Sequence, residues 1–271
     1  MNNRSDAPVV RLTAATKRFA TSSGGVHTAI RDIDLTIAPG EFVAIVGPTG
    51  CGKSTTLSLV SGLQRPSSGS VEVQGRPVGS IPPGVGYMFQ SDAMLPWRSV
   101  LANVAAGPIW RGTPKAAARA KARDWIARVG LAGFEGYYMH QLSGGMRKRV
   151  ALAQTLVNEP SILLMDEPFS ALDVQTKALM QQELLRLWAG TNASVLFVTH
   201  DLEEAIVLAD RVVVMTASPA RVKDDFRITL PRPRAVEELR TSTDFVAIYR
   251  EIWASLSSEV DTARKVDQRV A

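Results

Sequence analysis

Residues 42–54 read FVAIVGPTGCGKS, and this stretch decides the fold. The apolar residues Phe42 to Val46 predict a buried strand, and Ser54 to Ser61 predict the first turns of a helix. Between them, Gly47 to Ser54 match the pattern G-x-x-x-x-G-K-[ST] at every position. Strand, glycine-rich turn and helix form the context in which this pattern becomes a phosphate-binding loop. A plain glycine turn is the alternative, and the flanking elements disfavour it.

The residue types of this loop indicate its chemistry. Glycines let the backbone turn so that successive N–H groups face inward at a helix N-terminus, where anions are favoured. We expect Lys53 to reach the β- and γ-phosphates and the Ser54 hydroxyl to bind Mg²⁺. We assign no chemistry to the Cys51 thiol. The residues predicted to bind phosphate are Gly47, Pro48, Thr49, Gly50, Cys51, Gly52, Lys53, Ser54 and Thr55.

Two carboxylates follow a second apolar strand, Ile162 to Met165. Parallel sheets place their ligands at such strand ends. We therefore expect Asp166 to hold Mg²⁺ through its water shell and Glu167 to polarise the water that attacks the γ-phosphate. Alone, an acidic pair here more often begins a helix. The phosphate-binding loop upstream favours the catalytic interpretation.

Several further motifs resemble the nucleotide-binding subunit of an ABC transporter, in the order typical of that family. The resemblance covers about Val9 to Met215. The motifs that carry it are Leu142-Ser143-Gly144-Gly145-Met146, Asp166-Glu167-Pro168, Ser170-Ala171-Leu172-Asp173 and Thr199-His200-Asp201.

The resemblance implies a role for each matching residue. Ser143, Gly144 and Gly145 would clamp the γ-phosphate held by a partner subunit, so that two ATP sites form across a head-to-tail dimer. Asp173 would lie at the dimer seam. His200 would contact the γ-phosphate and the attacking water. Gln90 would sense Mg²⁺ and signal to the membrane subunit, and Phe19 would stack on adenine.

Some of these residues have a plainer interpretation. Phe19 also suits a core aromatic, and a lone His200 after the strand Val195 to Val198 suits a structural histidine. Ser143 to Gly145 suit a flexible linker, but the helix-like stretch from Met146 to Val157 favours an anion-binding helix start. His27 and His140 are interpreted as structural or exposed.

Three positions depart from the family pattern. Met146 replaces a commoner glutamine, Lys148 stands where glutamine is usual, and Gln154 stands where arginine is usual. Lys148 and Gln154 change the charge near the signature motif, so we expect an altered basal rate or partner fit. None of the three removes a group needed for hydrolysis.

The composition favours a cytosolic subunit. The 271 residues are 45% hydrophobic, enough for one substantial core. One cysteine excludes an internal disulfide, the longest apolar run is five residues, and Met1 to Asp6 lack the apolar stretch of a secretory signal. If the protein acts in transport, we expect separate chains to form the pore.

A basic segment accounts for part of the net charge of +5. Arg111 to Arg128 is rich in alanine and basic residues and predicts a helix with a solvated basic face. Proximity to the anionic inner leaflet is a second interpretation. Nucleic-acid binding is disfavoured because the aromatic residues that usually accompany such basic patches are absent, except for Trp110 and Trp125.

The predicted fold class is α/β, a P-loop NTPase core with an antiparallel β layer and an inserted helical subdomain. Residues 1–217 form the predicted ATPase domain, with the helical subdomain at about 91–156. Residues 218–271 form a tail that packs on the core or on the dimer, with a short helix from Phe245 to Leu256. The predicted strands are Val9 to Ala14, Ile33 to Ile37, Phe42 to Val46, Val71 to Val73, Val85 to Phe89, Ile162 to Met165, Val195 to Thr199 and Arg211 to Met215.

A narrower resemblance surrounds Gln90. Residues Met88 to Val104, together with His140-Gln141 and the segment Leu230-Pro231-Arg232-Pro233-Arg234, resemble the nitrate, sulfonate and taurine importer branch. The coupling helix of a membrane subunit would dock near Gln90. Trp97 suits a docking anchor or a core residue equally well.

The sequence therefore predicts the ATPase subunit of an ABC importer that uses ATP and Mg²⁺. The expected partners are a second copy, two membrane permease subunits and, indirectly, an external solute-binding protein, with no nucleic acid. We expect it at the cytoplasmic side of the inner membrane as a peripheral subunit.

The cargo and the functional class each leave a choice open. A pyrimidine precursor or another small solute could be the cargo in place of an oxyanion. Two interpretations come from different functional classes: a soluble ABC ATPase that acts on DNA or ribosomes, and a non-catalytic nucleotide-binding regulator. The first is disfavoured because the chain lacks a long coiled-coil insertion and a second ATPase unit. The second is disfavoured because Glu167 and His200 are both in place.

Overall fold

The computed structural model describes residues 7–22, 24–91 and 93–270, with side chains up to residue 265. The chain divides into two compact units, Met1–Pro83 with Thr191–Ala271, and Gly84–Gly190. Each unit is described by itself.

The first unit contains an antiparallel sheet of the order β2-β1-β4-β5. Strands β1 and β2 are longer than predicted, because polar residues continue both strands beyond the apolar signal. Strand β1 is irregular between Leu12 and Ala15, where Ala14 has a positive φ of 45°. The strands are β1 (Val10–Ala20), β2 (Val26–Ile37), β4 (Ser68–Val73) and β5 (Arg76–Pro77).

A second set of strands in this unit positions the phosphate-binding loop. Strand β3 pairs in parallel with β8 and β9, and β10 is antiparallel to β9. All five residues of β3 and of β8 are buried, as expected for a parallel sheet covered on both faces. The elements are β3 (Phe42–Val46), α1 (Lys53–Val60), β8 (Ser194–Val198), α7 (Leu202–Leu208), β9 (Arg211–Met215) and β10 (Val222–Arg227).

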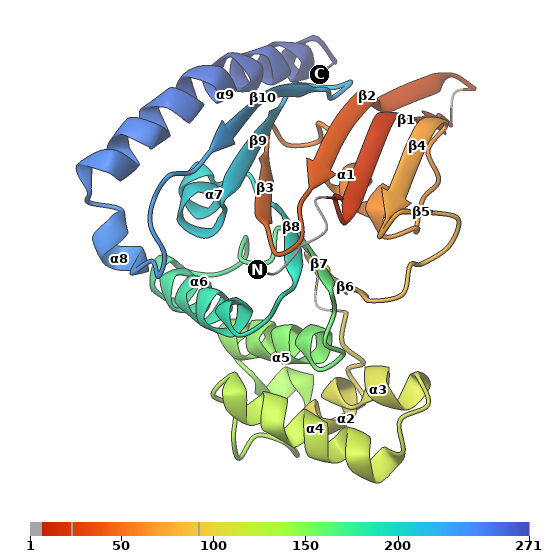
Figure 1. Cartoon of the computed structure of the whole chain (residues 1–271), viewed down its shortest axis with the longest axis vertical. Coiled ribbons are helices and arrows are strands. Elements are labelled where there is room, and N and C mark those ends of the chain that lie inside the picture. Colours follow the sequence, from red (N-terminus) through yellow and green to blue (C-terminus); the bar gives the residue numbers. More distant parts are fainter. Residues whose placement is uncertain (1–6, 23, 92, 271) are drawn as a thin grey trace. The chain divides into compact units, whose positions relative to one another are not determined.

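The tail is more helical than predicted. Helix α9 covers Thr243–Val270, so the prediction of a short helix from Phe245 to Leu256 was wrong in length. The helix contacts α7, β9 and β10 (Figure 1). Beyond Leu256 polar contacts hold it, since Glu259 pairs with Lys223 and accepts a hydrogen bond from the N–H of Ala217. The short helix α8 (Val236–Leu239) precedes α9.

The second unit has a parallel strand pair and a group of helices. In the pair β6·β7, Val85 lies opposite Ile162 and Met88 opposite Met165. Helix α2 contacts α4 and α5, and α4 contacts α5 (Figure 1). The elements are β6 (Val85–Met88), α2 (Val100–Val104), α3 (Ala106–Trp110), α4 (Lys115–Arg128), the 3-10 helix η1 (Met139–Gln141), α5 (Gly144–Leu156), β7 (Ile162–Asp166) and α6 (Val174–Ala189).

Helix α4 begins four residues later than predicted. Gly112 and Pro114 lie between α3 and α4, so Arg111 ends the preceding helix instead of belonging to α4. Ala118, Ala122 and Ile126 form its buried face. Its basic side chains lie largely on the exposed face, where Lys115, Arg119 and Arg123 are all exposed.

Candidate nucleotide-binding and catalytic site

The phosphate-binding loop connects β3 to α1 in the first unit. Gly50 has a φ of 74° and Gly52 a φ of 125°, values that residues with a side chain rarely adopt. A Cβ at Gly52 would also lie 2.6 Å from Cγ2 of Ile30 and 2.9 Å from the main-chain oxygen of Ala29. Glycine at this position is therefore required by both conformation and space.

The loop presents a lysine and a hydroxyl next to the helix start. The Nζ atom of Lys53 donates to the main-chain oxygens of Gly47 and Pro48, each at 2.9 Å. Ser54 is exposed. Cys51 is buried, and burial raises the pKa of its thiol, so the thiol is protonated at neutral pH.

The turn that carries His200 is fixed by its neighbours. The hydroxyl of Thr199 donates to Oε2 of Glu204 at 2.6 Å and accepts from the N–H of Asp201 at 3.0 Å. Asp201 in turn caps α7 by accepting from the N–H of Glu203 at 3.0 Å. His200 itself is exposed. No local sequence pattern predicts that Thr199 and Glu204 support this turn.

Phe19 lies on β1 in the first unit. It is half-buried, and the Nζ atom of Lys17 lies 5.1 Å from the centre of its ring. The core interpretation of Phe19 is therefore wrong. His27, which lies opposite Phe19 on β2, is exposed, and so is His140 in the second unit.

The second unit carries the two carboxylates at the end of β7. Asp166 is 9% exposed, and the Tyr87 hydroxyl donates to its Oδ2 atom at 3.4 Å. Glu167 has a positive φ of 41°, which is uncommon for a residue with a side chain. The hydroxyl of Ser170 donates to the main-chain oxygen of Glu167 at 3.0 Å. Non-glycine residues in this conformation are concentrated at functional sites.

Gln90 and Glu167 are brought together although 77 residues separate them. Nε2 of Gln90 lies 3.4 Å from Oε2 of Glu167, a long hydrogen bond. The main-chain oxygen of Gln90 accepts from Nζ of Lys148 at 2.8 Å. The sequence did mark Lys148 as unusual. A further signal was its place on the buried stripe of α5 with Leu152, Thr155 and Leu156.

The signature residues begin α5. Ser143 is the N-cap, and its hydroxyl accepts from the N–H of Met146 at 3.3 Å. A Cβ at Gly145 would lie 2.7 Å from Cγ2 of Thr176 in α6, so the helix starts approach closely there. Gly144 has room for a Cβ, with one atom near 4.0 Å.

Asp173 is the exposed N-cap of α6. Hydrogen bonds from the N–H and the hydroxyl of Thr176 lower the pKa of its carboxyl. The N–H of Thr176 lies 2.9 Å from Oδ1 of Asp173. The carboxylate therefore stays ionised at neutral pH.

The residues predicted to bind a metal offer the oxygen atoms that Mg²⁺ prefers. Among the described residues, no group of three or more His, Cys, Asp and Glu side chains could hold a metal ion. Mg²⁺ usually takes one or two protein oxygens and completes its shell with water and phosphate. In the second unit Asp166 offers a buried carboxylate of this kind, and in the first unit Ser54 offers an exposed hydroxyl.

Comparison with known proteins identifies the family. The profile of the ABC transporter family matches residues 30–170. The chain belongs to this family. An uncharacterised ABC transporter ATP-binding protein of Methanocaldococcus jannaschii is 45% identical over 245 residues, which are 90% of each chain.

Two relatives have a named cargo. The taurine import ATP-binding protein of Burkholderia pseudomallei is 39% identical over 89% of this ABC ATPase and 94% of its own length. The taurine import ATP-binding protein of Yersinia pestis is 40% identical over 81% of this chain and 88% of its own length.

Solved structures confirm the predicted fold class and the enzyme class. An ATP-binding cassette solved as a post-hydrolysis dimer with ADP and Pi is 28% identical, with a TM-score of 0.72, over 82% of this chain and 100% of its own. The chain is an ABC transporter ATPase that binds and hydrolyses ATP. Within the described residues, no helix combines the length and apolar character needed to cross a membrane.

Proposed function

We propose that this ABC ATPase drives the import of a small solute in the oxyanion class of nitrate, sulfonate or taurine. The support is the 39 and 40% identity to two taurine import ATP-binding proteins, together with the sequence from Met88 to Val104. Import of a pyrimidine precursor or another small solute is the alternative. A soluble ABC ATPase with no transport role is less favoured.

The observation that carries the catalytic proposal is the pairing of Gln90 with Glu167 at the end of β7. Glu167 polarises the attacking water, and the side-chain amide of Gln90 orients the Glu167 carboxylate. The phosphate-binding loop holds the nucleotide phosphates with its N–H groups and Lys53. His200 contacts the γ-phosphate, and Phe19 stacks on adenine.

Asp166 and Ser54 would hold Mg²⁺, and Gln90 would sense it. When bound, this ion neutralises the charge on the β- and γ-phosphates. The burial of Asp166 supports this assignment, because a desolvated carboxylate interacts more strongly with a cation.

The active form is proposed to be a head-to-tail dimer. Ser143, Gly144 and Gly145 face the nucleotide of the second copy, and Asp173 lies at the seam. The exposure of Ser143 and Asp173 and the start of α5 at the signature support this, since a helix N-terminus attracts an anion. The related cassette was solved as a dimer.

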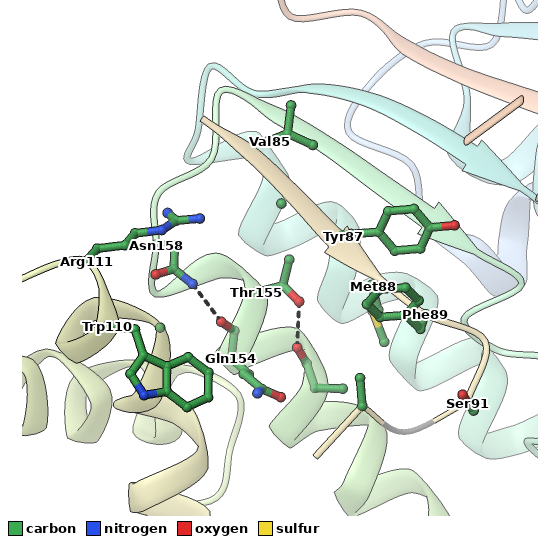
Figure 2. A pocket seen from close by; sticks show the side chains of 14 residues that line it. Val85, Tyr87, Met88, Phe89, Ser91, Trp110, Arg111, Gln154, Thr155 and Asn158 are labelled. Carbon is green, nitrogen blue, oxygen red and sulfur yellow. Dashed lines mark hydrogen bonds between the residues drawn. The ribbon is translucent and has the colours of Figure 1, made fainter. Parts of the chain in front are cut away.

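The permease partner is proposed to dock on the second unit beside Gln90. A hollow of about 210 Å³ lies there between the ends of β6 and α3 and one face of α5 (Figure 2). Trp110, which is 66% exposed, lines it, and Arg98 lies 5.7 Å from the centre of that ring. Trp97 is 71% exposed, so its core interpretation is wrong and the anchor role is favoured.

The remaining assignments complete the proposal. The ATPase is a peripheral subunit at the cytoplasmic side of the inner membrane, served indirectly by an external solute-binding protein. Residues 1–217 act as the ATPase domain, about 91–156 as the helical subdomain, and 218–271 as the tail. No nucleic acid takes part.

The test compares Glu167→Gln with the control Glu159→Gln, which changes an exposed glutamate paired with Lys121. We expect Glu167→Gln to bind ATP with unchanged affinity and to lose nearly all turnover, whereas Glu159→Gln keeps both. Unchanged turnover in Glu167→Gln would contradict the assigned role. Co-purification with a multi-span membrane protein, and turnover stimulated by taurine, nitrate or a pyrimidine precursor, then tests import and names the cargo.

A further inference from the structure

A lysine is buried in the helix that begins with the signature residues. Lys148 on α5 is 5% exposed, although lysine is almost never fully buried without a partner for its charge. It occupies the position where the related family usually has glutamine. Burying an ammonium group is costly, so its contacts are informative.

One of those contacts fixes the segment after β6. The Nζ atom of Lys148 donates to the main-chain oxygen of Gln90 at 2.8 Å, across 58 residues of sequence. A charged donor at this distance makes a stronger hydrogen bond than a neutral one. Gln90 itself is exposed and lies beyond the end of β6, so the strand ladder does not hold it.

The side chain of the same residue faces the carboxylate assigned to catalysis. Nε2 of Gln90 lies 3.4 Å from Oε2 of Glu167. Lys148, Gln90 and Glu167 thus form a continuous series of contacts from α5, through the segment after β6, to the end of β7. Moving the Gln90 backbone by about 1 Å would break its already long contact with Glu167.

We propose that Lys148 is a positioning residue for ATP hydrolysis, which holds the backbone of Gln90 so that the Gln90 amide orients the Glu167 carboxylate. This inference rests on the proposed function, in which Glu167 polarises the attacking water. Lys148 touches neither nucleotide nor water in this role. It ties Gln90 to the helix whose first residues face the second nucleotide of the proposed dimer.

A simple packing role for Lys148 predicts a different result. Loss of packing would lower the melting temperature and would weaken ATP binding and turnover together. Loss of positioning lowers the turnover number while ATP affinity is kept, because the phosphate-binding loop belongs to the first unit and Lys148 to the second.

The experiment compares Lys148→Met, Lys148→Arg and the matched control Arg149→Met in the full chain. Arg149 is the next residue of α5, and its Nη1 atom also donates to a main-chain oxygen, that of Val129, at 3.1 Å. We expect Lys148→Met to lower the turnover number by about tenfold or more, with ATP affinity by calorimetry within about twofold. Lys148→Arg, which keeps a charged donor, should retain most of the turnover of the unaltered chain. Arg149→Met should have a turnover number within about twofold of the unaltered chain.

The inference is overturned if Lys148→Met turns over within about twofold of the unaltered chain, or if Arg149→Met causes an equal loss. Should Lys148→Met not fold, Lys148→Leu, which also lacks a donor, is judged by the same ratios. Glu167→Gln is measured in parallel. A normal turnover number in Glu167→Gln refutes the proposed function. If Glu167→Gln loses its turnover while Lys148→Met keeps it, only the positioning role of Lys148 is refuted.

Discussion

The buried guanidinium of Arg234 gives the sharpest stability prediction in the first unit. Arg234 is 4% exposed and donates to four main-chain oxygens. Burial, with the nearby charge of Arg232, lowers its pKa to about 10, so it remains charged at neutral pH. Its acceptors are Ile206 at 3.2 Å, Val207 at 3.0 Å, Ala209 at 2.7 Å and Leu230 at 3.1 Å.

Three of these oxygens lie at the end of α7 or just after it, where a helix leaves its last carbonyls unpaired. Six of the seven residues of α7 are buried, so water is a poor substitute partner. Replacing Arg234 with methionine leaves these oxygens without their donor. Each buried oxygen without a hydrogen bond lowers the free energy of unfolding by about 1–3 kcal/mol. Relief of the buried charge offsets part of this, and we expect a net loss of about 3–5 kcal/mol.

This loss converts into a measurable shift. The shift in melting temperature is the lost free energy divided by the entropy of unfolding, which is about 2.1 cal/mol/K per residue. For a chain of 271 residues, the variant should therefore melt about 5–9 °C lower. Thermal unfolding followed by circular dichroism and calorimetry measures it. The comparison variant is Arg232→Met, because Arg232 pairs with Asp210 at 2.8 Å and donates to a single main-chain oxygen of α7, that of Leu208, at 2.6 Å. Since Arg232 is partly exposed, this variant should cost about 1–2 kcal/mol, less than Arg234→Met.

A melting temperature of Arg234→Met within about 2 °C of the unaltered chain, or a larger shift in Arg232→Met, would refute this prediction. Arg234→Lys sharpens the result. It keeps the charge but lacks the planar fork that reaches several oxygens at once, and we expect it to recover only part of the loss.

Two further predictions concern the same unit. Gly52→Ala should weaken ATP binding at least about tenfold, because its Cβ would meet the Ala29 main-chain oxygen, whereas Gly40→Ala, with a positive φ but open space, should leave affinity unchanged in calorimetry. Burial opposes ionisation of Glu259, but bonds from Lys223 and the N–H of Ala217 outweigh it and lower the pKa of its carboxyl. The difference in stability between the unaltered chain and Glu259→Gln should therefore be largest near neutral pH and should vanish as pH falls through that lowered pKa. A difference in melting temperature that stays constant down to acid pH would contradict this prediction.

The strands and the phosphate-binding loop were predictable because their signals are local. Phe42 to Val46 form an uninterrupted apolar run directly before the glycines, and the structure has β3 at those residues. Strand β1 was predicted only to Ala14, since beyond it the chain continues with largely polar residues and register shifts. Its continuation to Ala20 depends on pairing with β2, which no local pattern contains.

The supports of the candidate site were less predictable, because they depend on tertiary contacts. Gln90 and Glu167 were each identified by their motifs, but neither motif indicates a contact between them. Glu204 looks like an ordinary residue of a helix start, and only the fold places its carboxylate on the Thr199 hydroxyl. Lys148 is the intermediate case, since its place on an apolar stripe could have been noticed in the sequence.

Lys148 and Arg234 solve the same physical problem in different units. Each is a buried cation that donates to main-chain oxygens where regular hydrogen bonding ends, after β6 in one unit and at the end of α7 in the other. An apolar side chain could fill the same space but would leave those oxygens unpaired. Because α7 begins directly after the His200 turn and the segment after β6 contains Gln90, each cation stabilises a segment next to a residue proposed to act in hydrolysis. The main effect of the two variants should therefore differ: Arg234→Met mainly lowers the melting temperature, whereas Lys148→Met mainly lowers the turnover number.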